Sequence, residues 1–433
     1  MVESVSLRWR LRPKRDKIIL SSIELFHAKI QPMPAVKPEI LVWARETAGL
    51  SLEEAAHRLG IKEARGVAGE DRLAALERGE AAVSRPVLIK MSKQYRRPLL
   101  TFYLSAPPQR GDRGEDFRTL PETHTLEESL LDALLRDIRA RQSMVRAILE
   151  DEEDAQPLPF IGSMTIDDGV AAVVQSIKRV IGAELAEFRA QASPESAFAL
   201  LRRRVEEAGV FVLLAGNLGS YHTAMDVEVF RGFALADPIA PFIVINDQDA
   251  RPAWSFTLLH ELAHLWLGAT GVSGSYAETR MERFCNEVAA TFLLPVAELA
   301  LVGVTRQTDD QTAIKLIDDF AAERHLSRSM VAYRLRNAGR ISDESWRSLR
   351  GIFRTRWQAG RQAQRERARE REGGPNYYVV RRHKLGAALL KFVARNVSGG
   401  SLSPTKAGHV LGVKPRSVEP LLSGAALTGG QVG

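Results

Sequence analysis

The chain has 433 residues, of which 45% are hydrophobic and 26% are charged, and it carries a formal net charge of +7. This composition excludes disordered and fibrous proteins, and the length predicts several domains. The single cysteine, Cys285, excludes an internal disulfide framework and fits a reducing compartment. Because no apolar run is long enough to span a bilayer and the basic N-terminus lacks the apolar core of a signal peptide, we expect a cytoplasmic protein without membrane association.

The positive charge is concentrated in the last part of the chain. From Ser345 onward there are 17 Lys and Arg residues against four acids, a local balance of +13, so the remainder carries −6. Such segregation indicates an anionic partner, most commonly nucleic acid. A solvated basic helical face is the alternative, and composition alone does not separate the two.

Residues 1–36 form a basic extension, and residues 37–105 are predicted to be a helical domain of the helix-turn-helix type. The stretch "MPAVKPEILVWARETAGLSLEEAAHRLGI" predicts two short helices joined by a tight turn. Gly49 ends the first helix, and Ser51 with Glu54 forms a capping box for the second. Together with the following segment, these helices predict a compact five-helix unit.

The rest of the chain divides into four further segments. Residues 106–185 combine a Pro- and Gly-containing linker with a long amphipathic helix. Residues 186–340 contain three strand-like runs, "GVFVLLAGN", "VEVFRGFAL" and "PFIVIND", followed by a helix that carries two histidines. Residues 341–423 are basic and helical, with a second, weaker helix-turn-helix pattern in "LSPTKAGHVLGVKPRSVEPLL", and residues 424–433 form a tail predicted to be disordered.

These segments predict a mostly α fold with a small β-sheet. We expect a helical helix-turn-helix domain, an α+β domain around the histidine-containing helix, and a basic helical C-terminal region.

The histidine-containing helix, "SFTLLHELAHLWLG", has the spacing of a metal site. His260 and His264 are four residues apart and therefore share one face of the helix, where both can present a ring nitrogen to one ion. Glu261 lies beside that face and can hold and deprotonate a water molecule. A catalytic zinc ion also needs a third protein ligand and an open fourth position.

The segment "YAETRMERFCNEVAATFLLP" offers three carboxylates as the third ligand: Glu278, Glu282 and Glu287. We choose Glu282, because Asn286 lies one turn later and can hydrogen-bond its carboxylate. A glutamate ligand on a separate helix after the two histidines defines a gluzincin-like metallopeptidase arrangement. The group that stabilises the oxyanion is left open among four candidates: Tyr221, His222, Arg231 and Tyr276.

This site predicts peptide hydrolysis. We expect one Zn²⁺ per chain, with Mn²⁺ as the alternative metal, and Glu261 as the group that accepts a proton from water and passes it to the leaving amine.

Four segments, "FRGFAL", "PFIVIND", "FTLLHELAHLWLG" and "ERFCNEVAATFLLP", resemble the ImmA/IrrE family of metallo-endopeptidases in content and order. With the first domain included, residues 37–420 are similar to members that carry an N-terminal Cro/repressor-type (XRE) helix-turn-helix. The resemblance places metal ligands at His260, His264 and Glu282 and the catalytic residue at Glu261. It implies a zinc-dependent, site-specific endopeptidase that regulates transcription by cleaving a helix-turn-helix repressor, in DNA-damage or other stress responses or in mobile-element control. Some fused members belong to toxin–antitoxin pairs, so a toxin partner is a further expectation.

The first helix-turn-helix departs from this family pattern. Its segment "KEARGVAGEDRLAALERG" is long and acidic, which suits a phosphate-lined groove poorly, so binding of a related protein and binding of DNA both stay open for this domain. The basic C-terminal region is the better match to DNA. Its candidate contacts are Arg381, Arg382, Lys384, Lys406, Lys414 and Arg416. The alternative function is therefore a DNA-binding transcriptional regulator or antitoxin whose metallopeptidase domain acts as a protein-binding scaffold.

Overall fold

The computed structural model describes residues 36–108, 126–152, 155–273, 279–370 and 376–423. The chain divides into two compact units, one of Met1–Ala44 and Leu52–Pro107, the other of Arg45–Ser51 and Pro108–Gly433. The fold is mostly helical with a small sheet, which confirms the predicted fold class.

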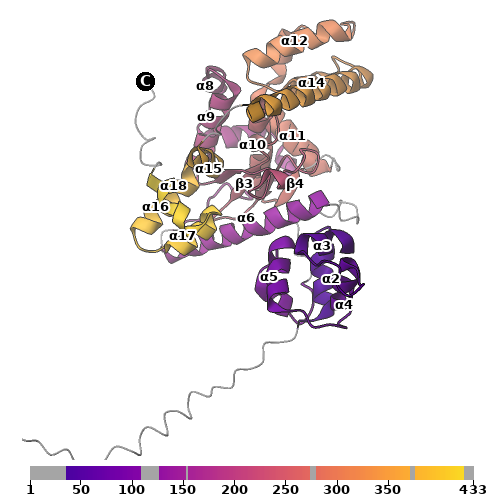
Figure 1. The fold of residues 1–433 in the computed structure, drawn as a ribbon. Coiled ribbons are helices and arrows are strands. Elements are labelled where there is room, and N and C mark those ends of the chain that lie inside the picture. Colours follow the sequence, from indigo (N-terminus) through magenta and orange to yellow (C-terminus); the bar gives the residue numbers. More distant parts are fainter. Residues whose placement is uncertain (1–35, 109–125, 153–154, 274–278, 371–375, 424–433) are drawn as a thin grey trace, which may run out of the picture. The chain divides into compact units, whose positions relative to one another are not determined.

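The first unit is a small helical bundle (Figure 1). Its elements are α2 (Pro38–Glu46), α3 (Leu52–Leu59), α4 (Gly69–Glu77), α5 (Arg85–Gln94) and the 3₁₀ helix η2 (Leu99–Tyr103). Gly49 and Gly60 adopt positive φ angles of 66° and 69° just after α2 and α3, where the sequence predicts helix ends. The first turn of α4 carries exposed Glu70 and Asp71.

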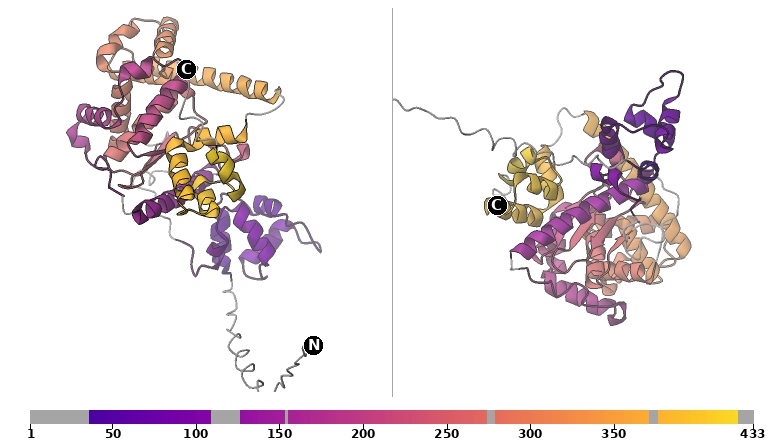
Figure 2. Two further views of the ribbon diagram at one scale, coloured as in Figure 1. Left: turned by 90° about the vertical axis from the view of Figure 1, so that its left-hand side faces the viewer. Right: turned by 90° about the horizontal axis from the view of Figure 1, so that it is seen from below.

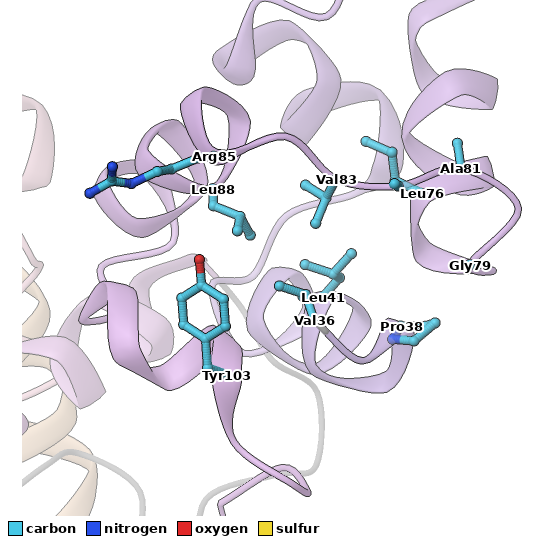
Figure 3. A pocket seen from close by; sticks show the side chains of 11 residues that line it. Val36, Pro38, Leu41, Leu76, Gly79, Ala81, Val83, Arg85, Leu88 and Tyr103 are labelled. Carbon is cyan, nitrogen blue, oxygen red and sulfur yellow. The ribbon is translucent and has the colours of Figure 1, made fainter. Parts of the chain in front are cut away.

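A cavity of about 450 Å³ lies within this unit (Figure 3). Apart from the Arg85 guanidinium and the Tyr103 hydroxyl, its lining side chains are apolar, so they offer neither a set of metal ligands nor a nucleophile. The lining residues are Val36, Pro38, Leu41, Leu76, Gly79, Ala81, Ala82, Val83, Arg85, Leu88 and Tyr103.

The second unit is built around a four-stranded mixed sheet. Its strands, in the order β1-β3-β2-β4, are β1 (Phe211–Leu214), β3 (Phe242–Ile245), β2 (Gly232–Leu235) and β4 (Gly271–Ser273). β1 is parallel to β3, and the other two pairs are antiparallel. The three strand-like runs of the sequence each contain one strand, whereas β4 was not predicted.

Helices cover both faces of the sheet (Figures 1 and 2). Val212, Ile243 and Ala234 face a core formed with α7 (Val170–Ile181), α9 (Pro194–Glu207), α10 (Arg251–Trp266) and α11 (Arg280–Leu293). Alternate residues of the same strands, such as Phe211, Phe233 and Phe242, face a second core with α6 (Leu126–Asp151), α16 (Ala387–Ser398) and α17 (Pro404–Leu411). Because both faces are buried, the strands are continuously apolar rather than alternating.

The C-terminal helices α16 and α17 are thus part of the main core of this unit. Beyond α11, the chain forms α12 (Asp310–Glu323), α13 (Arg328–Asn337) and the long α14 (Asp343–Glu370). The remaining short elements are η4 (Ile166–Asp168), α8 (Leu185–Arg189), η5 (Tyr221–Thr223), η6 (Val296–Val302), α15 (Tyr377–Leu385), η7 (Pro415–Ser417) and α18 (Val418–Ser423). Within the described residues, no helix alone is long and apolar enough to cross a membrane, and α11 with η6, bent by 67° at their break, satisfies that test only as a pair, by length and composition.

Candidate metal centre

The helix α10 is buried over almost its whole length, and three ionisable side chains lie in its C-terminal half. Pro252 stands at its start, where the missing N–H costs no hydrogen bond. His260 is 3% exposed, and His264 and Glu261 are 0% exposed. Burying such groups is costly unless partners compensate, so their position in a buried helix requires a specific reason.

The neighbouring helix α11 supplies the third group. The Thr279 hydroxyl accepts a hydrogen bond of 3.1 Å from the backbone N–H of Glu282, which fixes the start of α11. Glu282 lies in the first turn and is 7% exposed. The cap therefore holds the Glu282 carboxylate where α11 packs against α10.

The three side chains converge on one point. The Nε2 atoms of His260 and His264 are 3.1 Å apart, and the Glu282 carboxylate lies 3.2 Å from the first and 3.1 Å from the second. Ligands of a tetrahedral zinc ion with bonds of about 2.0–2.1 Å are roughly 3.3 Å apart, which is close to these separations. Hydrogen bonds satisfy this triangle less well than a metal would, because two N–H groups that both donate to the carboxylate would face each other across 3.1 Å, whereas one cation satisfies all three ligand atoms. The residues present therefore fit a divalent metal, and His260, His264 and Glu282 could hold one.

The electrostatics of Glu282 agree with a role as an anionic ligand. Burial alone would raise the pKa of this carboxyl, but hydrogen bonds and charge interactions with His260 and His264 lower the pKa to about 2. Glu282 is therefore a carboxylate at every physiological pH.

The other predicted third ligand that the structure describes, Glu287, is engaged elsewhere. Its carboxylate accepts hydrogen bonds of 2.6 Å from both Arg334 and Asn337 of α13. Glu278 lies outside the described residues. Asn286 is half-buried one turn after Glu282, with no hydrogen bond to the Glu282 carboxylate among the described residues, so its supporting role stays a prediction.

Glu261 is packed against a glycine that the sequence analysis did not single out. A methyl group added to Gly232 of β2 would lie 2.7 Å from Oε1 of Glu261 and 2.7 Å from Cγ2 of Thr257. The strand can therefore approach α10 at this point only because Gly232 has no side chain. The motif "FRGFAL" contains this glycine, but its contact depends on how the strand meets the helix.

The oxyanion candidates are only partly placed. Arg231 precedes Gly232 and forms an ion pair of 2.9 Å with Asp249. His222 is exposed in η5. Tyr276 lies outside the described residues.

The six candidate DNA contacts fall into two groups. Arg381 donates to the carbonyls of Leu411 and Gly412, and Arg382 donates to the carbonyl of Pro420. Lys384 forms an ion pair of 2.6 Å with Asp247. These three side chains hold the C-terminal helices together or to the sheet. The exposed candidates are Lys406, Lys414 and Arg416.

A small mixed sheet, a buried helix with two histidines and an acidic residue, and a glutamate from the next helix define a metallopeptidase-type domain. Residues 207–336 match the model of peptidase family M78, described as the IrrE N-terminal-like domain. The match contains all four residues of the centre and supports both the ImmA/IrrE family and a metallopeptidase-type function. Neither a curated protein nor a solved structure matches the chain.

Proposed function

We propose that the chain is a zinc-dependent endopeptidase, in which His260, His264 and Glu282 hold the metal and Glu261 is the catalytic base. The observation that carries this proposal is the convergence of three buried ligand atoms beside a buried carboxylate, inside the region that matches a peptidase family. Mn²⁺ is the alternative metal, since the same donor set accepts it.

The roles of the residues follow from their chemistry. A divalent cation held by His260, His264 and Glu282 would supply Lewis-acid polarisation of the scissile carbonyl and would lower the pKa of water. Glu261 follows His260 directly in α10, and its carboxylate takes a proton from the attacking water and delivers it to the leaving amine. Gly232 keeps β2 close to this carboxylate, which fixes its orientation.

We further propose that the substrate is a helix-turn-helix repressor and that cleavage switches on the genes it controls. The support is the match of residues 207–336 to the IrrE N-terminal-like domain, together with the motifs that resemble the ImmA/IrrE proteases.

The test compares cells that naturally make the wild-type protein with cells that make Glu261→Gln, before and after DNA damage. New protein N-termini are mapped by mass spectrometry. We expect a small set of cuts, in one repressor-like protein, that occurs with wild type and not with the variant. The substitution keeps the size of the side chain, and metal content and melting temperature of the purified variant should equal those of wild type.

An exposed glutamate provides the matched control. Glu195→Gln on α9 removes the same charge from an exposed position and should cut as wild type does. Identical cuts from Glu261→Gln would disprove the peptidase proposal. In that case the alternative, a DNA-binding regulator with a scaffold domain, would take its place.

A further inference from the structure

The helix α14 carries a row of arginines along one side. Residues three, four and seven positions apart lie on one face of an α-helix. Four arginines of α14 follow this spacing, and we call them the arginine stripe: Arg347, Arg350, Arg354 and Arg361. No acidic residue occurs between Glu344 and Glu366.

A different side of α14 holds the helix in place. Leu349 and Phe353 are buried in the core shared with α12 and α13, and α12 lies alongside α14 in Figure 1. Beyond Phe353, no residue of α14 whose exposure the structure describes is buried. In the left view of Figure 2, the C-terminal half of the helix extends past the helices it packs against. The stripe is therefore a surface feature and has no part in the core.

The C-terminal half of the stripe touches both loops that lead into the metal centre. Arg354 forms an ion pair of 2.6 Å with Glu228, four residues before Gly232. Arg361 donates a hydrogen bond of 2.5 Å to Gln248, which lies just before α10. The loop of Glu228 leads into β2, the strand that contacts Glu261, and the loop of Gln248 leads into α10, the helix that carries the two histidines. The C-terminal end of the stripe therefore contacts the loops that lead into the proposed active site.

The two arginines in the N-terminal half of the stripe are not neutralised by close ion pairs with described residues. Arg347 and Arg350 are exposed, and neither forms an ion pair within 4.0 Å with a described residue. The charge of Asp343, one turn before Arg347, interacts with that arginine, but Asp343 is itself paired with Arg336. The Arg350 guanidinium lies 5.5 Å from the ring centroid of Trp346, which orders it without neutralising it. Arg354 is 53% exposed in its pair with Glu228, so a second carboxylate can reach it.

We propose that the arginine stripe binds an acidic segment of the protein substrate and so delivers the neighbouring peptide bond to the metal centre. This inference rests on the proposed peptidase function and names the chemistry of its substrate. Guanidinium groups pair with carboxylates through two parallel hydrogen bonds. The stripe spans 15 residues of helix, or 14 rises of 1.5 Å, which make about 21 Å; an extended segment of roughly six residues matches this length.

The charges around the stripe favour a peptide over a nucleic acid. Asp318, Glu228 and Asp249 lie close to the helix or to the loops that it contacts. A continuous phosphate backbone would be repelled by these acids, whereas a peptide can place carboxylates only where arginines stand. Nucleic acid is therefore the competing outcome of the test.

The test uses the full-length Glu261→Gln protein loaded with zinc, so that binding is measured without cleavage. The probe is a fluorescein-labelled 12-residue peptide of alternating Glu and Ser, and the readout is fluorescence anisotropy. Adding Arg347→Gln and Arg350→Gln should weaken binding about 10-fold, since each exposed pair contributes up to about 1 kcal/mol. The matched control, Lys93→Gln with Lys391→Gln, removes the same charge from exposed positions on other helices and should leave binding unchanged.

Three results would overturn the proposal. These are equal binding by the stripe variant, an equal loss in the lysine control, and tighter, stripe-dependent binding of a 20-base-pair duplex DNA that displaces the peptide. The outcomes also separate the two proposals. If the peptide does not bind but cells with the wild-type protein show specific cuts, only the proposal for the stripe is rejected. If the peptide binds through the stripe but no such cuts occur in cells, only the peptidase function is rejected.

Discussion

Gly232 has no side chain, and this allows the β2 backbone to pack directly against the carboxylate of Glu261. Glu261 is fully buried, and the β2 backbone lies against it at the distance that glycine alone permits. An ordered carboxylate loses little entropy when it engages water, so its packing contributes to rate.

Gly232→Ala should therefore damage catalysis without emptying the metal site. The added methyl group must displace Glu261 or Thr257, and a shift of about 1 Å at a catalytic group costs on the order of 100-fold in rate. Cleavage of the substrate identified in cells and zinc content of the same sample are the two measurements. Gly360→Ala is the control, because a methyl group there meets no atom within 4 Å. Full activity of Gly232→Ala would show that the contact with Glu261 is not needed.

Glu282 should contribute most of its binding energy as a charge. Because its pKa is about 2, it needs no deprotonation to bind metal at neutral pH. Glu282→Gln keeps the shape and removes the charge, so we expect zinc affinity, measured by competition with a chelating dye, to fall at least about 100-fold. An unchanged affinity would remove Glu282 from the ligand set.

Much of this centre can be predicted from local sequence. Helix periodicity alone places His260 and His264 together. The sequence favours Glu282 over Glu287 through the position of Asn286. The contacts that engage Glu287, from Arg334 and Asn337 of α13, come from a later helix and are not visible in a local pattern. In the same way, the charge of Lys384 is visible in the sequence, but its partner Asp247 is not. Charged residues can be read from the sequence, but the residues with which they pair are known only from the fold.

Among the helices, the junction of α15 and α16 joins the C-terminal region to the sheet. Arg202 of α9 is buried and donates to the carbonyls of Val212, His383 and Lys384. Glu206 accepts hydrogen bonds from the backbone N–H groups of Ala387 and Ala388 at the start of α16. Burial raises the pKa of Glu206, and Arg202 opposes that rise. Such a buried pair destabilises a fold when one partner is displaced.

Gly386→Ala should break this junction. A methyl group there would lie 2.1 Å from Oε1 of Glu206 and 2.5 Å from Nη2 of Arg202. Gly169 has nearly the same backbone angles, φ 81° and ψ 155° against 79° and 161°, at the N-cap of α7, but nothing lies within 4 Å of its added methyl group.

Both alanines carry the same backbone strain, about 1–3 kcal/mol. The free energy of unfolding in urea should fall by at least about 2 kcal/mol more for Gly386→Ala than for Gly169→Ala. Equal losses of unfolding free energy in the two variants would mean that displacing the Arg202–Glu206 pair does not destabilise the fold.

The elements themselves were only partly predictable. Three strands are recognised as apolar runs between Gly, Pro, Asn and Asp residues, but β4 has three residues and no pattern of its own. The apolar positions of α17, such as Val410 and Leu411, predict a short helix. That this helix packs against the core beside the sheet is a long-range contact that no local pattern contains.

For the whole molecule, two compact units predict two unfolding transitions. The metal centre belongs to the second unit, so zinc should stabilise that transition alone. At a free zinc concentration about 1,000 times the Kd, binding adds roughly 4 kcal/mol to the free energy of unfolding of this unit. Removal of zinc by EDTA should therefore lower the midpoint temperature of the higher-enthalpy transition by roughly 5 °C or more in differential scanning calorimetry. Readdition of zinc should restore it. A shift of the smaller transition instead would place the metal in the first unit.

The measurement that tests the metal centre most directly is anomalous diffraction at the zinc absorption edge from crystals of the zinc-loaded, full-length protein. We predict one strong peak per chain, bounded by Nε2 of His260, Nε2 of His264 and the carboxylate of Glu282, with the fourth position filled by solvent beside Glu261. A peak elsewhere, no peak at this point, or a fourth protein ligand that closes the site would contradict a catalytic metal held by these three residues.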